Sequence, residues 1–74
     1  MDVKDVINIY RWAEDFVKEM LPYFTHKECN IAYTHIDATI WEFVRRLHFS
    51  QSDLASLVLE REATFAEIRK YIFD

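Results

Sequence analysis

The chain has 74 residues, of which 51% are hydrophobic and 16% aromatic, and its formal net charge is −4. This length permits one domain with a small core, and the acidic balance gives no electrostatic reason for tight binding to nucleic acid or to an anionic membrane. The sequence contains no glycine. Glycine supplies the positive-φ positions of hairpin turns and phosphate-binding loops, so Walker loops and dinucleotide-binding fingerprints are excluded.

Cysteine usage and the N-terminal sequence bear on the compartment. The single cysteine, Cys29, cannot form an internal disulfide, which is typical of a reducing environment. The first residues, MDVKDV, lack the basic-then-apolar layout of a signal peptide. No apolar run approaches the ~18 residues of a membrane span. We therefore expect a cytoplasmic protein with no membrane partner.

The first predicted helix covers residues 3–21. Asp2 can cap its N-terminus, and Asp5 adds negative charge to the first turn. Pro22 ends the helix, because proline disfavours the helical conformation at the residue before it and lacks a backbone donor. The apolar residues alternate in steps of three and four, which predicts a heptad stripe made of Val3, Val6, Tyr10, Ala13, Val17 and Met20.

The second predicted helix covers residues 26–48. Thr25 and Glu28 have the spacing of a capping box, in which each side chain accepts a hydrogen bond from the other residue's backbone amide. The same alternation of four and three then predicts a stripe made of Cys29, Tyr33, Ile36, Ile40, Phe43 and Leu47.

The third predicted helix covers residues 51–73, with Ser50 or Ser52 as its cap. Its predicted stripe consists of Leu54, Val58, Phe65, Ile68 and Ile72. Arg61 occupies the stripe position between Val58 and Phe65. We expect Arg61 either to reach solvent past its neighbours or to bind a carboxylate such as Glu14 or Glu42 and so fix the packing register.

These three segments follow one another without a linker or a repeat. We predict a single helical domain over residues 1–74, with an all-α fold: a three-helix antiparallel bundle with long helices. A core of this size is marginal for a monomer, so we also expect the bundle to associate with itself.

The first helix carries more apolar surface than its stripe needs. Ile9, Trp12 and Phe16 lie beside the stripe, and Ile7 and Leu21 lie on its other flank. Together they widen the apolar arc to about 220°, against roughly 100° for an ordinary surface helix. Trp12 is farthest from the centre of the stripe and is expected to face away from the core. Trp41 on the second helix is expected to extend this face. Aromatic side chains anchor protein interfaces, although Trp12 could instead fold over the end of its own bundle.

No constellation of catalytic or metal-binding residues is evident. His26 and Cys29 are three residues apart and could share a metal, but a structural zinc site needs four ligands and the others are missing. His35 and His48 have no nucleophile and carboxylate at the spacing of a triad. We therefore predict no catalytic residue, no metal, no cofactor and no enzymatic activity.

A competing interpretation comes from the C-terminal half. Residues 49–57 (FSQSDLASL) and 63–68 (ATFAEI) resemble a repressor-type helix-turn-helix. The resemblance implies a DNA-binding segment over residues 50–72 and a turn near residues 59–62. Glutamates at the turn and on the recognition helix oppose that interpretation, since strong helix formers favour a continuous helix and negative charge repels phosphate. The residues implied in DNA binding are Gln51, Arg61, Thr64, Arg69 and Lys70.

The sequence therefore predicts a small non-enzymatic regulator, adaptor or inhibitor. It is expected to bind another protein, a second copy of itself, or both. The alternative is a helix-turn-helix transcription regulator. The residues expected to bind the protein partner are Ile9, Trp12, Phe16 and Trp41.

Overall fold

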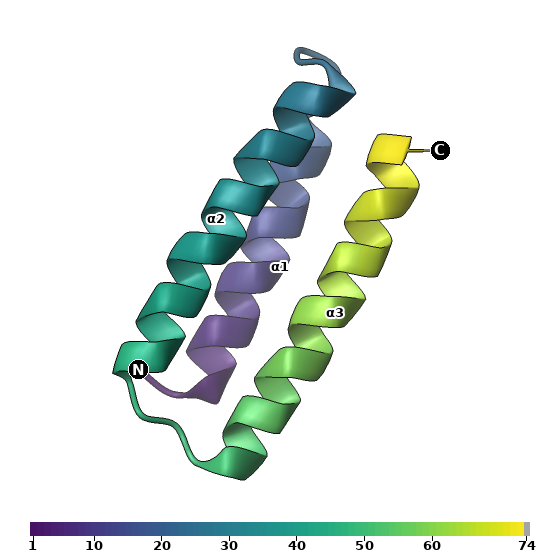
Figure 1. Cartoon of the computed structure of the whole chain (residues 1–74). Coiled ribbons are helices and arrows are strands. Elements are labelled where there is room, and N and C mark those ends of the chain that lie inside the picture. The colour runs from purple at the N-terminus through teal and green to yellow at the C-terminus, as the bar shows by residue number, and fades with distance from the viewer. Residues whose placement is uncertain (74) are drawn as a thin grey trace.

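The computed structural model describes residues 1–73 and consists of three α-helices. α1 spans Val3–Met20, α2 spans His26–Arg46 and α3 spans Gln51–Phe73. Figure 1 shows that the chain reverses direction at each connection, so that sequential helices are antiparallel. Within the described range there is no strand. The predicted all-α, three-helix antiparallel bundle is confirmed.

All three predicted N-terminal caps form, and for α3 the cap is Ser50, whose Oγ accepts a hydrogen bond from the backbone amide of Asp53 at 3.2 Å. The backbone amide of Glu28 donates to Oγ1 of Thr25 at 3.1 Å, and the amide of Thr25 donates to Oε1 of Glu28 at 2.9 Å. These hydrogen bonds lower the pKa of the Glu28 carboxyl, chiefly through the Thr25 backbone amide. Asp2 and Asp5 form an equivalent pair at the start of α1, so Asp5 completes a capping box in addition to placing charge in the first turn.

The C-terminal ends of two helices differ slightly from the predicted ends. α1 ends at Met20, one residue earlier than predicted, and α2 ends at Arg46, two residues earlier. After α2, His48 has a φ of 52°, the left-handed conformation that commonly terminates helices. Glycine is usual at such a position, and a chain without glycine fills it with histidine.

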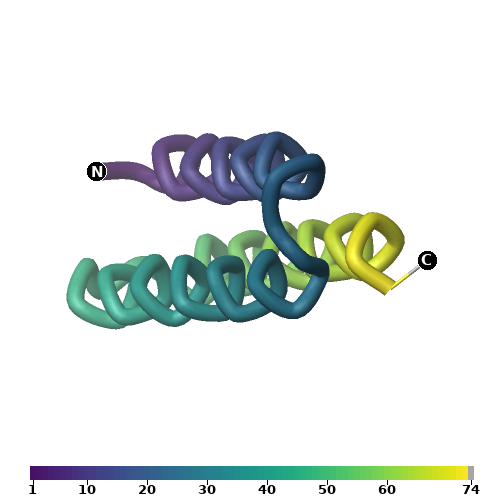
Figure 2. Tube along the Cα trace, turned by 90° about the horizontal axis from the view of Figure 1, so that it is seen from above, coloured from purple at the N-terminus to yellow at the C-terminus, as the bar shows by residue number. Residues whose placement is uncertain are grey.

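The core lies along α1, which packs against both other helices. Figure 2 shows α1 lying over the pair formed by α2 and α3. As predicted, the α1 stripe faces inward. The buried hydrophobic residues form two clusters, one made of Ala13, Val17, Cys29, Tyr33, Ile68 and Ile72, and the other of Val6, Tyr10, Ile40, Val44 and Leu57.

The stripe on α2 differs from the predicted one in its C-terminal half. Phe43 and Leu47 are exposed, whereas Asp37 and Val44 are buried. A straight α-helix has 3.6 residues per turn, so a strict seven-residue repeat drifts by about 20° per heptad. Over the length of α2 this drift carries the last two predicted stripe residues out of the core.

The stripe on α3 is out of register at its N-terminal end. Val58 was predicted to face the core, but it is 37% exposed and the preceding Leu57 is fully buried. Arg61 binds Asp37 on α2, as described below, and the buried residues Leu57 and Thr64 lie four residues before and three residues after it, on the same face of α3. The buried face of α3 therefore includes the position of the interhelical Arg61–Asp37 contact, and apolar spacing alone predicted the position of Val58 incorrectly.

The molecule is elongated, with extents of 38 × 18 × 15 Å. None of the helices in the described part of the chain has the length and hydropathy required to cross a membrane.

Candidate functional site

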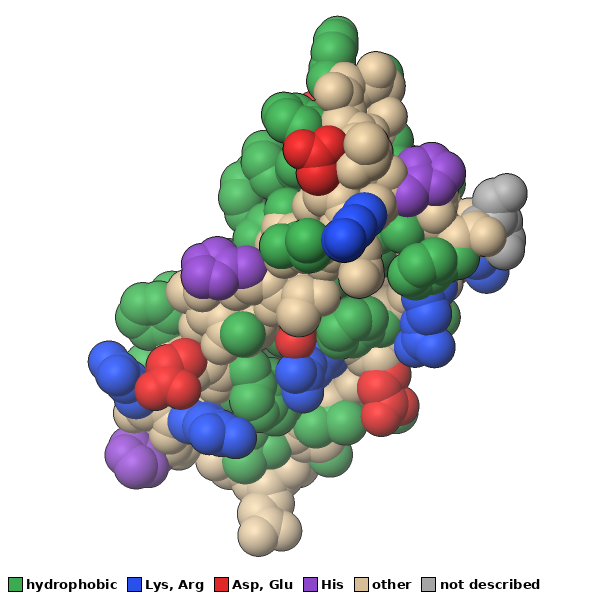
Figure 3. Space-filling view, turned by 45° about the horizontal axis from the view of Figure 1, so that its top comes forward, with side chains coloured by type: hydrophobic (Ala, Val, Ile, Leu, Met, Phe, Trp, Pro, Cys, Tyr) green, Lys and Arg blue, Asp and Glu red, His purple; other side chains and the backbone are tan. Residues whose placement is uncertain are grey.

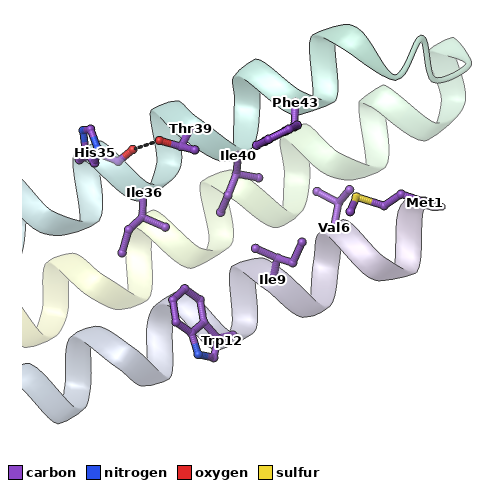
Figure 4. A pocket seen from close by; sticks show the side chains of 9 residues that line it. All are labelled: Met1, Val6, Ile9, Trp12, His35, Ile36, Thr39, Ile40 and Phe43. Atoms are coloured by element: carbon purple, nitrogen blue, oxygen red, sulfur yellow. Dashed lines mark hydrogen bonds between the residues drawn. The ribbon is translucent and has the colours of Figure 1, made fainter.

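An apolar groove lies between α1 and α2, on the face of this helix pair that α3 does not cover. Its volume is about 490 Å³. Figure 4 shows the side chains of α1 and α2 pointing toward one another across it, with α3 behind them. The lining residues are Met1, Val6, Ile9 and Trp12 from α1 and its N-terminus, and His35, Ile36, Thr39, Ile40 and Phe43 from α2.

The α1 wall contains Ile9 and Trp12, two of the three α1 residues that the sequence singled out, whereas Phe16 lies outside the lining. Trp12 is 56% exposed and faces away from the three-helix core, as predicted. Its ring stacks on that of Phe16, with 5.3 Å between centroids and 17° between planes. This contact is expected for residues four apart on one helix. Ile9 is half-buried and packs against the core, so its outer edge alone faces the groove.

The α2 wall is a part of the groove that sequence reasoning missed. Phe43 is 58% exposed and stands at the rim, while Ile36 and Ile40 form the floor. The exposure of Phe43 could have been predicted from the sequence, because the 3.6-residue period of α2 turns Phe43 away from the core. The hydroxyl of Thr39 donates to the backbone carbonyl of His35 at 2.9 Å, so it makes its hydrogen bond within the helix.

Trp41 does not join this groove. Its ring lies beneath the guanidinium of Arg61, 4.7 Å from centroid to Cζ, and packs against the core cluster that contains Leu57. The structure therefore brings Ile9, Trp12 and Phe16 together on one face and leaves Trp41 facing α3.

A buried polar cluster joins the three helices behind the groove. Asp37 of α2 accepts hydrogen bonds from Tyr10 of α1 and from Arg61 of α3. The Tyr10 hydroxyl lies 2.9 Å from Oδ1. The Arg61 guanidinium binds both carboxylate oxygens, with Nε 2.8 Å from Oδ1 and Nη2 2.7 Å from Oδ2. Such a bidentate pair is strong and directional.

The partner of Arg61 differs from the candidates named from the sequence. Glu14 pairs with Lys18 and Glu42 pairs with Arg46, each four residues along its own helix. Asp37 was missed because a lone aspartate among apolar residues is predicted to be exposed. Asp37 lies four residues after the stripe residue Tyr33 and therefore on the same face of α2, and this spacing could have indicated its burial.

The environment of this cluster suits packing better than catalysis. Burial, with the Asp37 hydrogen bond second, raises the pKa of Tyr10, and the hydrogen bonds to Asp37 raise the pKa of Arg61. Tyr10 is fully buried and Asp37 is 4% exposed, so both groups are closed off from solvent in this conformation. The Tyr33 hydroxyl is buried without a hydrogen-bond partner, and burial raises its pKa. Its ring meets Phe65 edge to face at 5.0 Å.

The helix-turn-helix geometry does not form. α3 runs unbroken from Gln51 to Phe73, so residues 59–62 are helical and the turn that this alternative requires is absent. Arg61 is engaged with Asp37, and Thr64 is buried with its hydroxyl bonded to the carbonyl of Glu60. Of the residues implied in DNA binding, those exposed to solvent are Gln51, Arg69 and Lys70.

Outside the groove, exposed hydrophobic side chains are scattered over the surface. Figure 3 shows hydrophobic side chains reaching the surface between charged ones on the visible face. Large exposed residues outside the groove include Tyr23, Ile31, Leu59 and Phe73. Within residues 1–73 no three His, Cys, Asp or Glu side chains gather closely enough to hold a metal ion.

Comparison with known proteins adds no relative: no family model, no curated protein and no solved structure matches the chain.

Proposed function

We propose that this chain is a non-enzymatic protein-binding module that acts by seating part of another protein against the α1–α2 groove. The observation that carries the proposal is a concave apolar site with an exposed aromatic side chain on each wall. Trp12 and Phe43 stand on opposite walls, both more than half exposed, above an apolar floor. Isolated exposed hydrophobic residues are common on protein surfaces, whereas a concave apolar site with aromatic rims is typical of interfaces.

The polar groups support a binding role more than a chemical one. The buried Tyr10 phenol and the partly exposed Arg61 guanidinium are both bound to the buried Asp37 carboxylate. The groove itself is lined by aliphatic and aromatic side chains together with His35 and Thr39. A surface of this kind occupies or blocks a partner, as a regulator, adaptor or inhibitor does. The buried free thiol of Cys29 suits the reducing environment of the cytoplasm.

Binding of a purified partner tests the proposal. Tagged protein is used to isolate bound proteins, each candidate is purified, and its affinity is measured by titration calorimetry. Trp12→Ala should weaken binding by more than ~1 kcal/mol, about fivefold in Kd, because an exposed aromatic anchor loses its contacts. Leu59→Ala is the matched control, since Leu59 is 68% exposed on α3 and lies outside the groove.

An unchanged Kd for Trp12→Ala, with an intact helical circular dichroism spectrum, would remove the groove from the function. Equal weakening by Leu59→Ala would do the same. Sedimentation equilibrium of the isolated chain, with and without Trp12→Ala, shows whether a second copy competes for this face.

A further inference from the structure

The two connections between the helices differ in sequence. Residues 21–25 join α1 to α2 and include Pro22, which breaks or kinks a helix that runs through it. Residues 47–50 join α2 to α3 at one end of the bundle, as Figure 1 shows, and they contain neither proline nor glycine. The sequence therefore permits α2 and α3 to join into one helix, whereas it opposes the joining of α1 and α2.

The backbone leaves helical geometry over only a short part of the second connection. Leu47 keeps a right-handed helical conformation, and its amide donates to the carbonyl of Phe43 at 3.1 Å. The φ of 52° at His48 is less favourable for a residue with a Cβ than for glycine. No carbonyl of the described chain accepts a well-formed hydrogen bond from the backbone amides of residues 48–52. A helix through this connection would give each of these amides an acceptor four residues back and would return His48 to a negative φ.

The contacts that hold α3 lie mostly within the helix itself. α3 packs most extensively on α1 and less extensively on α2. Its buried residues Leu57 and Ile68 belong to the two core clusters. Its Arg61 binds Asp37 of α2, with 2.7 Å between Nη2 and Oδ2. Because these contacts depend on the position of α3 and not on the connection before it, α3 of a second copy in that position would make the same contacts.

We propose that the chain can exchange α3 with a second copy of itself. In the exchanged dimer residues 47–50 are helical, α2 and α3 form one helix over residues 26–73, and each α3 packs on α1 and α2 of the other molecule. A helix over that range is about 70 Å long. The longest extent of the folded chain is 38 Å.

Protein concentration determines which form prevails. The exchange gains helical hydrogen bonds and relieves the positive φ of His48. It loses the Ser50 cap and the packing of Phe49 against the core, and it requires two molecules to associate. The monomer is therefore the form at low concentration, and the exchanged dimer accumulates as concentration rises.

The exchange would change the number of binding sites on the molecule and not the site itself. The α1–α2 groove is lined by residues of α1, its N-terminus and α2, which stay together in one chain. An exchanged dimer therefore carries two grooves, and a partner with two suitable segments would bind it more tightly than it binds the monomer. This control of valence goes beyond the proposed function, and the exchange itself is tested without any partner.

Two substitutions at His48 test the exchange. The chain is refolded from urea over a range of concentrations, and the dimer association constant is measured by size-exclusion chromatography with light scattering. His48→Ala favours a continuous helix, whereas His48→Gly accepts a positive φ and weakens a helix. Both variants lack the same imidazole, so contacts of that ring cancel in the comparison. We expect the association constant of His48→Ala to exceed that of His48→Gly by at least about tenfold, because each dimer contains two such connections.

Mixing two further variants distinguishes exchange from association of intact bundles. Arg61→Met leaves the Asp37 carboxylate buried without its cation, and Asp37→Leu leaves Arg61 without its carboxylate. In an exchanged heterodimer the two apolar substitutes meet in one unit and the native Asp37–Arg61 pair forms in the other. Native mass spectrometry of the co-refolded mixture should therefore show the heterodimer at least about fivefold above its statistical proportion. Bundles that keep their own α3 gain nothing from mixing.

Four results would overturn the inference: equal association constants for His48→Ala and His48→Gly, a statistical mixture of dimers, a monomer at every concentration of His48→Ala, or a dimer whose longest dimension in small-angle scattering stays near the 38 Å of the monomer. None of these measurements involves the partner of the groove. Failure of the exchange would leave the proposed function standing, and an unchanged partner affinity for Trp12→Ala would leave the exchange standing.

Discussion

At the scale of single residues, Arg61 and Asp37 are the pair on which the interior depends most. The Asp37 side chain is 5% exposed and the Arg61 side chain 32% exposed. Arg61→Met leaves the Asp37 carboxylate buried without its cation, and we expect a loss of about 3 kcal/mol in the free energy of unfolding. Arg11→Met is the matched control, because Arg11 and Glu60 form an exposed pair at 3.8 Å whose contribution should be below ~1 kcal/mol.

Urea denaturation of the two variants measures the difference. Similar losses for Arg61→Met and Arg11→Met would show that the buried pair contributes no more than a surface one. Asp37→Asn should cost less than Arg61→Met, because the partly exposed guanidinium can turn to solvent whereas the carboxylate cannot.

The two buried tyrosines should respond oppositely to removal of their hydroxyls. Tyr10 donates to Asp37, so Tyr10→Phe removes a hydrogen bond to a charged group and should destabilise the protein by about 1.5–3 kcal/mol. The Tyr33 hydroxyl has no partner, so Tyr33→Phe should be neutral or slightly stabilising. Thermal and urea unfolding of the two variants check this contrast. A loss for Tyr33→Phe as large as that for Tyr10→Phe would contradict it.

At the scale of the helices, the register of α3 predicts different losses of stability when two adjacent residues are truncated. Leu57 is fully buried and Val58 is 37% exposed. Leu57→Ala should cost about 2–5 kcal/mol, because it removes buried methyl groups and leaves a cavity. Val58→Ala should cost less than ~1 kcal/mol. Equal losses, measured by urea denaturation, would contradict the burial of Leu57 in place of Val58.

Helix starts and ends were largely predictable from the sequence, because their causes are local. The Thr25–Glu28 capping box and the stop before Pro22 involve residues within one turn of each other. The core faces of α2 and α3 were less predictable. They include the contact of Asp37 with Arg61, which joins residues 24 apart in sequence and has its geometry only in the assembled bundle.

For the same reason, the α1 wall of the candidate groove could be predicted from the sequence and the α2 wall could not. Surplus apolar residues on α1 could be read from the sequence, and these included the groove residues Ile9 and Trp12 together with Phe16, which stacks on Trp12 outside the lining. The opposite wall required knowing which edge of α2 faces α1. That orientation places Phe43 in the groove and Trp41 against Arg61, whereas the apolar spacing placed them the other way round.

At the scale of the whole molecule, stability should fall in alkaline solution. Burial raises the pKa of both Tyr10 and Tyr33 in the folded state, so the native protein retains their protons above pH ~10, where the unfolded chain releases them. The unfolded state then binds fewer protons, and the free energy of unfolding decreases as pH rises through that range.

Parallel titrations of tyrosinate absorbance and far-ultraviolet circular dichroism check this expectation. Ionisation of the buried tyrosines should coincide with loss of helix, and the Tyr33→Phe variant should unfold at higher pH. Complete tyrosine ionisation with the helices intact would mean that the two rings are accessible to hydroxide.

The arrangement of α1 between its neighbours also has a consequence for the order of folding. α1 and α3 form the most extensive interface in the molecule, although they are the first and last helices of the described chain. Contacts between segments so distant in sequence require closure of a long loop before they yield stabilisation. An α1–α2 hairpin formed first would leave the α3 side of its core open to water. We therefore expect docking of α3 onto α1 to limit the folding rate, and folding of this bundle to be slower than its helical content alone suggests.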